Sequence, residues 1–301
     1  MSTGFDLDMS SNVESKNSIH SRIRHCPPRD SGILIVDKPE GLSSFALVAK
    51  VKRILRLKKA GHCGTLDPFA TGVMVVCVNQ ATRIADQLSL QNKQYRFTMH
   101  LGAETDTLDR TGRIVQTYEG AAIHESDLLR VSRQFVGAYR QQVPRYAAVK
   151  VAGKRLYELA RKGVEVDLPC RNVNIHYLEL IRYDWPEAVM EVSCSKGTYV
   201  RQLAADIGRE LGCGAYLEEL KRLASGSFHI SRAVSFEELK RVAKDNCWRE
   251  KLIPMKEALE HLPAITIEDS QILRGLSNGY LDPAWAAEKS ENAIVFHVPV
   301  S

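Results

Sequence analysis

Thirteen residues, AGHCGTLDPFATG at positions 60–72, form the most informative stretch of this 301-residue sequence. They include three glycines, and Asp67 is followed directly by Pro68. This composition is typical of a tightly shaped loop that presents one carboxylate, with glycines that let a ligand approach the backbone closely. On the residues alone, the more common role for Asp67 would be that of a turn residue whose side chain bonds its own backbone.

The segment before this loop predicts a buried strand and an amphipathic helix. Ile33–Val36 is a short apolar run that ends at Asp37, as expected for a buried strand. Ser43 is a suitable N-cap, because the apolar residues of segment 44–55 recur on one helical face. Positions 41–66 contain six Lys or Arg residues and no Asp or Glu. Such a basic face suits a polyanion such as nucleic acid, although a solvated helix face would have the same pattern.

The other predicted strands and helices do not alternate strictly along the chain. In segment 95–101, apolar and polar residues alternate from Tyr95 onward, which predicts a half-buried strand. We therefore predict an α+β fold with a largely antiparallel mixed sheet flanked by helices, rather than a doubly wound fold. Further strands are expected at 73–78, near 173–181 and near 188–195, and helices at 125–136, 155–162, 200–211 and 235–244.

The composition predicts three parts in the chain. Residues 1–30 are Ser-rich and without periodicity, which predicts a flexible N-terminal extension. Residues 31–250 are expected to form the main domain, and residues 251–301 a short β-rich C-terminal one. Residues 255–301 carry three basic and seven acidic side chains, whereas the whole chain has a net charge of +5. The positive charge therefore lies in the main domain and not in the C-terminal segment.

Several classes of protein are disfavoured by missing features. The longest apolar run has six residues (Val73–Val78), whereas a membrane-spanning helix needs about 20. The sequence has no Walker loop, no G-x-G-x-x-G, no H-E-x-x-H and no G-x-S-x-G. Its seven cysteines are scattered without a C-x-x-C pair, and the N-terminus lacks a secretory apolar region. We expect a reduced, cytoplasmic protein without a structural metal or a cofactor.

A second informative segment runs from Ser195 to Leu203, and it reads as a strand end that enters a helix. The first helical turn would carry Tyr199 and Arg201. An arginine close to an aspartate holds the carboxylate ionised and oriented. From sequence alone, Arg201 could pair with Asp67 or, because it is nearer along the chain, with Asp206.

Together these segments resemble the TruB family of RNA pseudouridine synthases. The similarity runs in collinear order over residues 32–250. Besides the 61–72 loop, it is carried by GILIVDKP at 32–39, KQY at 93–95, LGAETDTLD at 101–109, QVP at 142–144, KVAGKRLYE at 150–158, residues 197–208 and LKRL at 220–223.

The resemblance implies isomerisation of uridine to pseudouridine in tRNA, normally at uridine 55 of the T-loop. It implies the pseudouridine synthase fold, with a small PUA-like domain at the C-terminus. Asp67 matches the catalytic aspartate of the family, and the reaction uses no cofactor and no metal. The expected partner is the T-stem-loop of tRNA, and the protein is expected to act as a monomer away from membranes.

The resemblance also implies the substrate-binding residues. Tyr95 would stack on the target base, Tyr199 would line the uridine pocket, and Arg201 would pair with Asp67. His62 would occupy space around the extruded nucleotide. Leu220 would form part of the pocket wall, whereas the residues alone predict a helix-core leucine there.

The sequence departs from the family pattern at two places and leaves two alternative functions open. At 142–148 it reads QVPRYAA, where the family more often has Pro-Pro and Tyr-Ser. Cys63 stands where the family usually has Thr, and we expect this small residue to preserve activity. A guide-dependent synthase of the dyskerin type shares the G-T-L-D-P segment, but the sequence that follows favours a stand-alone enzyme. A non-catalytic module that binds and folds tRNA is the alternative from another class, and the intact set of site residues argues against it.

Overall fold

The computed structural model describes residues 30–151, 153–164, 166–265, 267, 269–278, 280, 294 and 295. The predicted N-terminal extension, apart from Asp30, and most of the chain after Tyr280 lie outside these residues. No described helix is both long enough and apolar enough to cross a lipid bilayer.

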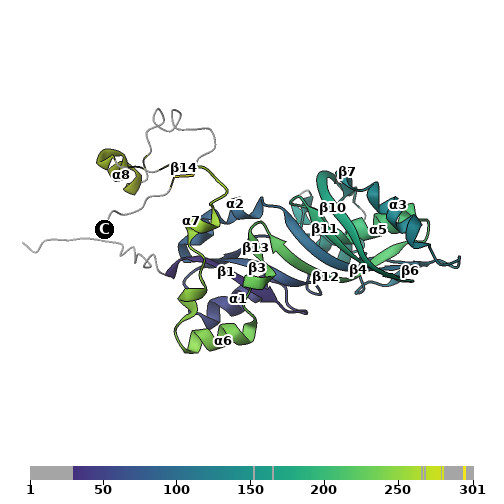
Figure 1. The fold of residues 1–301 in the computed structure, drawn as a ribbon, viewed down its shortest axis with the longest axis horizontal. Helices are drawn as coiled ribbons and strands as arrows, with labels where there is room; N and C mark the ends of the chain where they lie inside the picture. The colour runs from purple at the N-terminus through teal and green to yellow at the C-terminus, as the bar shows by residue number, and fades with distance from the viewer. Residues whose placement is uncertain are drawn as a thin grey trace, which may run out of the picture.

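One nine-stranded sheet organises the fold (Figure 1). Its strand order is β1-β3-β12-β4-β11-β10-β7, with β2 paired to β3 and β13 paired to β12. Every pair is antiparallel except β12 with β3. The predicted α+β fold with a largely antiparallel mixed sheet is confirmed. The strands are β1 (Gly32–Lys38), β2 (Ala60–His62), β3 (Thr71–Val78), β4 (Lys93–Leu101), β7 (Gly137–Gln142), β10 (Cys170–Asp184), β11 (Glu187–Cys194), β12 (Ala215–Ser225) and β13 (Phe228–His229).

Helices flank this sheet. Figure 1 shows α1 and α6 near β1 and β3, and α3 and α5 near the other end of the sheet. The helices are α1 (Ser44–Ile54), α2 (Ala85–Ser89), α3 (Glu125–Arg133), α4 (Leu156–Arg161), α5 (Val200–Glu210), α6 (Phe236–Lys244), α7 (Met255–Ala258) and α8 (Ser270–Ser277), with 3-10 turns at Asn79–Ile84, Ile230–Arg232 and Trp248–Lys251. Three two-stranded sheets complete the described fold: β5 (Ala103–Thr105) with β6 (Ile114–Thr117), β8 (Lys150–Val151) with β9 (Lys154–Arg155), and β14 (Ala264–Ile265) with β15 (Ile294–Val295).

Strand β1 is buried on both faces, which explains its unbroken apolar sequence. Leu34 and Val36 belong to the large core that also contains the apolar face of α1. Ile33 and Ile35 belong to a second core on the opposite face, together with Ile253. The backbone of Ile33 also exchanges two hydrogen bonds with that of Ile253, both of 2.8 Å. The buried strand predicted at 33–36 is therefore confirmed.

Helix α1 confirms the predicted N-cap and amphipathic pattern. The Oγ atom of Ser43 accepts a hydrogen bond of 3.1 Å from the backbone N–H of Ala46, which satisfies one free donor of the first turn. Leu47 and Val51 are fully buried, whereas Lys52 is exposed. The helix thus presents its basic side to solvent, directly before the loop that carries Asp67.

The helix that the residues alone predict around Leu220 is wrong. Residues 215–225 form strand β12, which pairs with β4 along its length and with β3 at Lys221 and Arg222. Its sequence, AYLEELKRLAS, repeats leucine at spacings that also fit a helix. Pairing with a neighbour on each side buries the strand centrally, and this tertiary context outweighs local helix propensity.

Candidate active site

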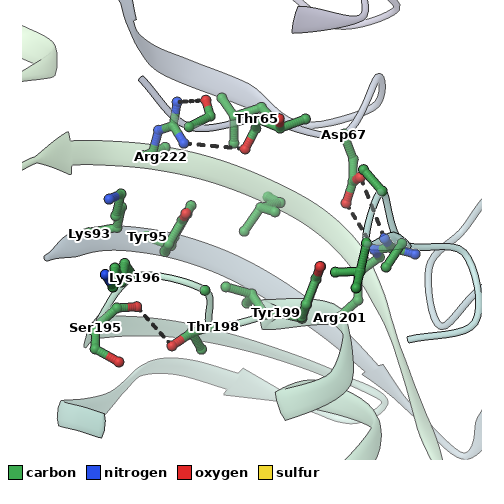
Figure 2. Close-up of a pocket in the computed structure, with 18 of the residues that line it drawn as sticks. Thr65, Asp67, Lys93, Tyr95, Ser195, Lys196, Thr198, Tyr199, Arg201 and Arg222 are labelled. Carbon is green, nitrogen blue, oxygen red and sulfur yellow. Dashed lines mark hydrogen bonds and ion pairs between the residues drawn. The ribbon is translucent and has the colours of Figure 1, made fainter. Parts of the chain in front are cut away.

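A cavity of about 390 Å³ opens where the Asp67 loop meets strands β4 and β12 and the start of α5 (Figure 2). Segments far apart in the sequence contribute to its wall: residues 64–67, residues 146–149 and residues 195–201. Five of the six site residues expected from sequence line it, namely Asp67, Tyr95, Tyr199, Arg201 and Leu220. The cavity is therefore the candidate active site.

The loop before Asp67 is tied to the N-terminus of α1. The Oγ atom of Ser44 accepts a hydrogen bond of 2.9 Å from Leu66 N–H and donates one of 3.0 Å to Leu66 O. The N–H of Gly41 donates to Pro68 O at 2.8 Å. These bonds fix the backbone on both sides of Asp67 and so limit the positions that its carboxylate can take.

Lys38, at the end of β1, forms hydrogen bonds with the backbone of the same loop. Its side chain is fully buried, and Nζ donates hydrogen bonds to the carbonyl oxygens of Pro39 at 3.1 Å, Pro68 at 3.0 Å and Ala70 at 2.5 Å. Burial lowers the pKa of Lys38 to about 8, and the nearby negative charge of Asp67 opposes this shift. Lys38 therefore stabilises the turn that follows Asp67.

The loop ends at Gly72, where only glycine fits. Its φ angle is +97°, and a Cβ atom there would lie 2.3 Å from the carbonyl oxygen of Arg222 on β12. This close approach accompanies the parallel pairing of β3 with β12 at Gly72 and Arg222. Glycine at this position therefore lets the loop join the central sheet.

Asp67 is paired with Arg201, as the resemblance implies. The Nε atom of Arg201 lies 2.9 Å from Oδ2 of Asp67, and Nη1 lies 3.4 Å from Oδ2 of Asp109. Arg201 also donates to the carbonyl oxygens of Thr107 at 2.9 Å and Tyr146 at 3.3 Å. The side chain of Arg201 is only 4% exposed, whereas that of Asp67 is 35% exposed. The carboxylate is thus held by a buried cation while remaining accessible from the cavity.

Both alternatives that sequence left open for this pair are wrong. Asp206 does not bind Arg201, because its carboxylate accepts hydrogen bonds from Gln202, Arg209 and Tyr139. The turn after Asp67 does exist, with Ala70 N–H donating to Asp67 O at 3.1 Å. The turn uses the backbone carbonyl, however, and leaves the carboxylate to Arg201.

Tyr95, Tyr199 and Leu220 form apolar walls of the cavity. Tyr95 on β4 and Leu220 on β12 are 8% and 7% exposed. Tyr199 is the N-cap residue of α5, and its ring lies 5.2 Å from the guanidinium carbon of Arg171. Its backbone is fixed by Gln141, which accepts from Tyr199 N–H at 2.8 Å and donates to Tyr199 O at 3.0 Å. Burial raises the pKa of both tyrosines, so both rings are neutral at physiological pH.

His62 is the predicted site residue that does not line the cavity. It ends β2, where it pairs with Val76 of β3. Burial lowers the pKa of His62, and the positive charge of Arg222 lowers it further, so the neutral imidazole is favoured. Next to it, Cys63 is fully buried, and its Sγ lies 3.3 Å from Sγ of Cys77. Both thiols are free, and burial together with the contact to Cys63 raises the pKa of Cys77.

The cavity residues that were not predicted as site residues include two buried cations, Lys93 and Arg222. Lys93 lies two residues before Tyr95 on β4, so extending the alternation by one step would have placed it on the same face. Arg222 lies directly opposite Tyr95 on the neighbouring strand β12. Because the residues alone predict a helix there, this pairing could not be predicted. Among the described residues, no group of three or more His, Cys, Asp or Glu side chains is placed to hold a metal ion.

The chain is similar to known protein families and to solved structures. Residues 52–200 match a family model described as TruB family pseudouridylate synthase (N terminal domain), and residues 201–260 match the tRNA pseudouridylate synthase B C-terminal domain. The crystal structure of a Cbf5–Nop10–Gar1 complex contains a chain with a similar fold, with a TM-score of 0.66 and 30% identity. That alignment covers 83% of this chain and 68% of the other.

Relatives of higher identity cover most of both chains. A protein of Syntrophobacter fumaroxidans named tRNA pseudouridine synthase B is 61% identical over 260 residues, which cover 86% of this chain and 85% of that protein. A protein of the same name from Bacillus licheniformis is 39% identical over 277 residues, with 90% and 85% covered. The two family models together span residues 52–260, which include every residue that lines the cavity.

Proposed function

The chain belongs to the TruB family of pseudouridine synthases, and on that basis we propose that it converts one uridine of tRNA, uridine 55 of the T-loop, to pseudouridine. The observation that carries this proposal is the Asp67 carboxylate, which faces a cavity of about 390 Å³ and is held by the buried Arg201. Relatives named tRNA pseudouridine synthase B support tRNA as the class of substrate.

The reaction requires an ionised carboxylate and no cofactor. The N-glycosidic bond from N1 of uracil to C1′ of ribose breaks, the base turns, and a bond from C5 to the same C1′ forms. N1 gains a proton and C5 loses one, so the net change is an isomerisation. Asp67 would act at the sugar or the base, as nucleophile or as proton acceptor, and in either role Arg201 keeps it oriented.

The other site residues would position the uridine. Tyr95 would stack on the base, a contact worth about 1–3 kcal/mol in single-stranded nucleic acids. Tyr199 and Leu220 would hold the base from the sides, since both line the same cavity. His62, which pairs with Val76 of β3 and does not line the cavity, would occupy space around the extruded nucleotide.

The base must leave the folded T-loop to reach Asp67, which costs a few kcal/mol. Contacts with RNA phosphates would offset this cost. Exposed basic side chains on and after α1 are available for such contacts, among them Lys50, Lys52 and Arg53. We further propose residues 31–250 as the catalytic domain, a PUA-like domain from residue 251, and action as a monomer.

Release of tritium tests this function. Uridine labelled with tritium at C5 loses the label when the new bond forms, so tRNA labelled in this way reports turnover directly. We expect wild-type protein to release tritium from one site per tRNA, and Asp67→Asn to release almost none. Asp127→Asn is the matched control, because Asp127 is a partly exposed residue on α3 that pairs only with Arg130 among the described residues.

Other outcomes would identify other functions. Equal release by wild type and Asp67→Asn would contradict the role of Asp67. Tight tRNA binding without release by wild type would indicate a non-catalytic tRNA-binding module. Release that depends on an added guide RNA would indicate the guide-dependent type of synthase.

A further inference from the structure

The cavity has a second end that the role of Asp67 does not explain. Figure 2 shows Lys93 and Lys196 at the end of the cavity away from Asp67 and Arg201, with Tyr95 near them. Arg222 lies on the same side of the cavity as this group, opposite Tyr95 on the neighbouring strand. A base that stacks on Tyr95 would therefore lie between one carboxylate and a cluster of cations.

Lys93 is a buried cation with one free donor. Its side chain is 6% exposed, and Nζ donates hydrogen bonds of 2.6 Å to Ser89 O and 2.6 Å to Gln91 O. An ammonium group has three N–H donors. The third donor of Lys93 has no partner among the residues that the structure describes, and the side chain lines the cavity.

Arg222 is more deeply buried and is also held by neutral groups. It is 1% exposed, and Nε donates to Val73 O at 2.7 Å. Its Nη1 and Nη2 atoms donate to Thr65 O at 3.4 Å and Gly64 O at 3.3 Å. Within the described part of the chain, neither Arg222 nor Lys93 forms an ion pair with a carboxylate. Arg201 differs from both, because it contacts Asp67 and Asp109.

Buried cations without a counter-ion are costly, so their presence beside a substrate cavity calls for a negative charge in the substrate. Uracil supplies one during the proposed reaction. When the N1–C1′ bond breaks, the electron pair stays on the base, and the charge spreads over N1, O2 and O4. Asp67 must lie near C1′, so the far edge of a base stacked on Tyr95 points toward the cationic end.

We propose that Lys93 and Arg222 form an electrostatic clamp that stabilises the uracil anion produced when the glycosidic bond breaks. The inference rests on the proposed isomerisation and adds a catalytic group to it. Such cations act mainly in the transition state, because the charge is absent from bound uridine and from pseudouridine. Formation of the C5–C1′ bond consumes an electron pair of the anion, and loss of the C5 proton and protonation of N1 restore a neutral base.

The test compares Lys93→Met and Lys93→Arg with wild type in single turnover at saturating RNA. One RNA carries uridine at the target position, and a second carries 5-fluorouridine, whose fluorine withdraws charge from the base anion. Chromatography of the digested nucleosides measures loss of the starting nucleoside. Arg222 is left intact, because its contacts with three backbone carbonyls would make loss of folding hard to separate from loss of catalysis.

For the uridine RNA, we expect Lys93→Met to lower the single-turnover rate by about 100-fold, as loss of one donor to a developing negative charge does in other enzymes. Lys93→Arg should retain most of the rate. With 5-fluorouridine, whose anion needs less stabilisation, the loss caused by Lys93→Met should be at least about 10-fold smaller than with uridine.

Two results would overturn the clamp. An equal loss with both bases would show a structural role for Lys93. A salt-dependent loss of RNA affinity with an unchanged rate at saturation would show that this end binds a phosphate group. Wild-type turnover of the same uridine RNA is measured in each series, so failure of the proposed function is seen separately, as absence of turnover in wild type.

Discussion

The two ends of the cavity hold their charged groups in opposite ways. At one end, the buried Arg201 lies between Asp67 and Asp109, so each charged group has a partner of opposite charge. At the other end, Lys93 and Arg222 are buried against backbone carbonyls and the sulfur of Met74, and neither pairs with a carboxylate among the described residues. The compensated end holds the Asp67 carboxylate in place before substrate arrives. The uncompensated end stores positive charge for a group that becomes negative only during reaction.

The largest effect should come from breaking the compensated end. Arg201→Met leaves Asp67 and Asp109 without their shared cation, and removal of one partner from a buried ion pair costs about 3–5 kcal/mol in the free energy of unfolding. Loss of orientation at Asp67 should lower turnover at least about 100-fold. Urea denaturation and tritium release measure the two effects.

Arg209→Met is the matched control for that experiment. Arg209 pairs with Glu104 and Asp206, but its side chain is 46% exposed, so its loss should cost at most about 1 kcal/mol. Equal losses for the two arginine variants would contradict the distinction between a buried and a surface ion pair.

A smaller loss of turnover should follow when the Asp67 loop loses backbone hydrogen bonds while the Asp67–Arg201 ion pair stays intact. Lys38→Met removes the donor to the carbonyl oxygens of Pro39, Pro68 and Ala70. Each buried acceptor left unpaired costs about 1–3 kcal/mol. We expect lower stability and roughly tenfold slower turnover, because Asp67 loses part of its backbone support. Lys244→Met, at an exposed position of α6, should change neither.

The pH dependence of turnover should distinguish a catalytic role of Lys93 from a role in stability. Burial lowers the pKa of Lys93 to about 8, so the ammonium form predominates below pH 8 and is lost as the pH rises through 8. Turnover should therefore fall above pH 8. The free energy of unfolding should rise over the same range, because between pH 8 and about 10.4 the unfolded chain binds more protons than the folded one.

The variant Lys93→Arg sharpens that prediction, because arginine stays charged throughout this range. Its turnover should remain high above pH 8. An unchanged alkaline decline in Lys93→Arg would assign the titration elsewhere, and Lys38, whose burial also lowers its pKa to about 8, would be the first candidate.

The smallest effect is expected outside both ends. Cys63→Thr places a hydroxyl beside Sγ of Cys77, where it can replace the thiol contact of 3.3 Å. Neither sulfur lines the cavity. Turnover should stay within about twofold of wild type, because neither side chain lines the cavity and threonine is close to cysteine in size. A tenfold loss in the tritium assay would show that this buried pair shapes the Asp67 loop.

Local patterns predicted the local parts of the site well. The strand at 33–36, the N-cap Ser43 and the alternation from Tyr95 all follow from short-range periodicity. The Asp67–Arg201 pair joins residues 134 positions apart, and proximity along the chain favoured Asp206 instead. The resemblance to a family supplied that pairing, because local pattern carries no information on such distant contacts.

The basic side chains at the second end were missed for related reasons. Lys93 lies one alternation step before the predicted strand, whose start was placed at Tyr95. Arg222 lies on a strand whose leucine spacing also fits a helix. Only the strand register shows that Arg222 faces Tyr95. Charge alone could not place either group, since most lysines and arginines lie on the surface.

The parallel junction between β3 and β12 also bears on how the enzyme folds. Thr71 and Gly72 meet Lys221 and Arg222 there, so the junction closes a chain segment of about 150 residues, whose loop-closure entropy must be overcome before the contact forms. The β10–β11 hairpin and α5 need only short-range contacts. During refolding, therefore, secondary structure should form first. The ability to act on RNA should return only when β3 and β12 pair.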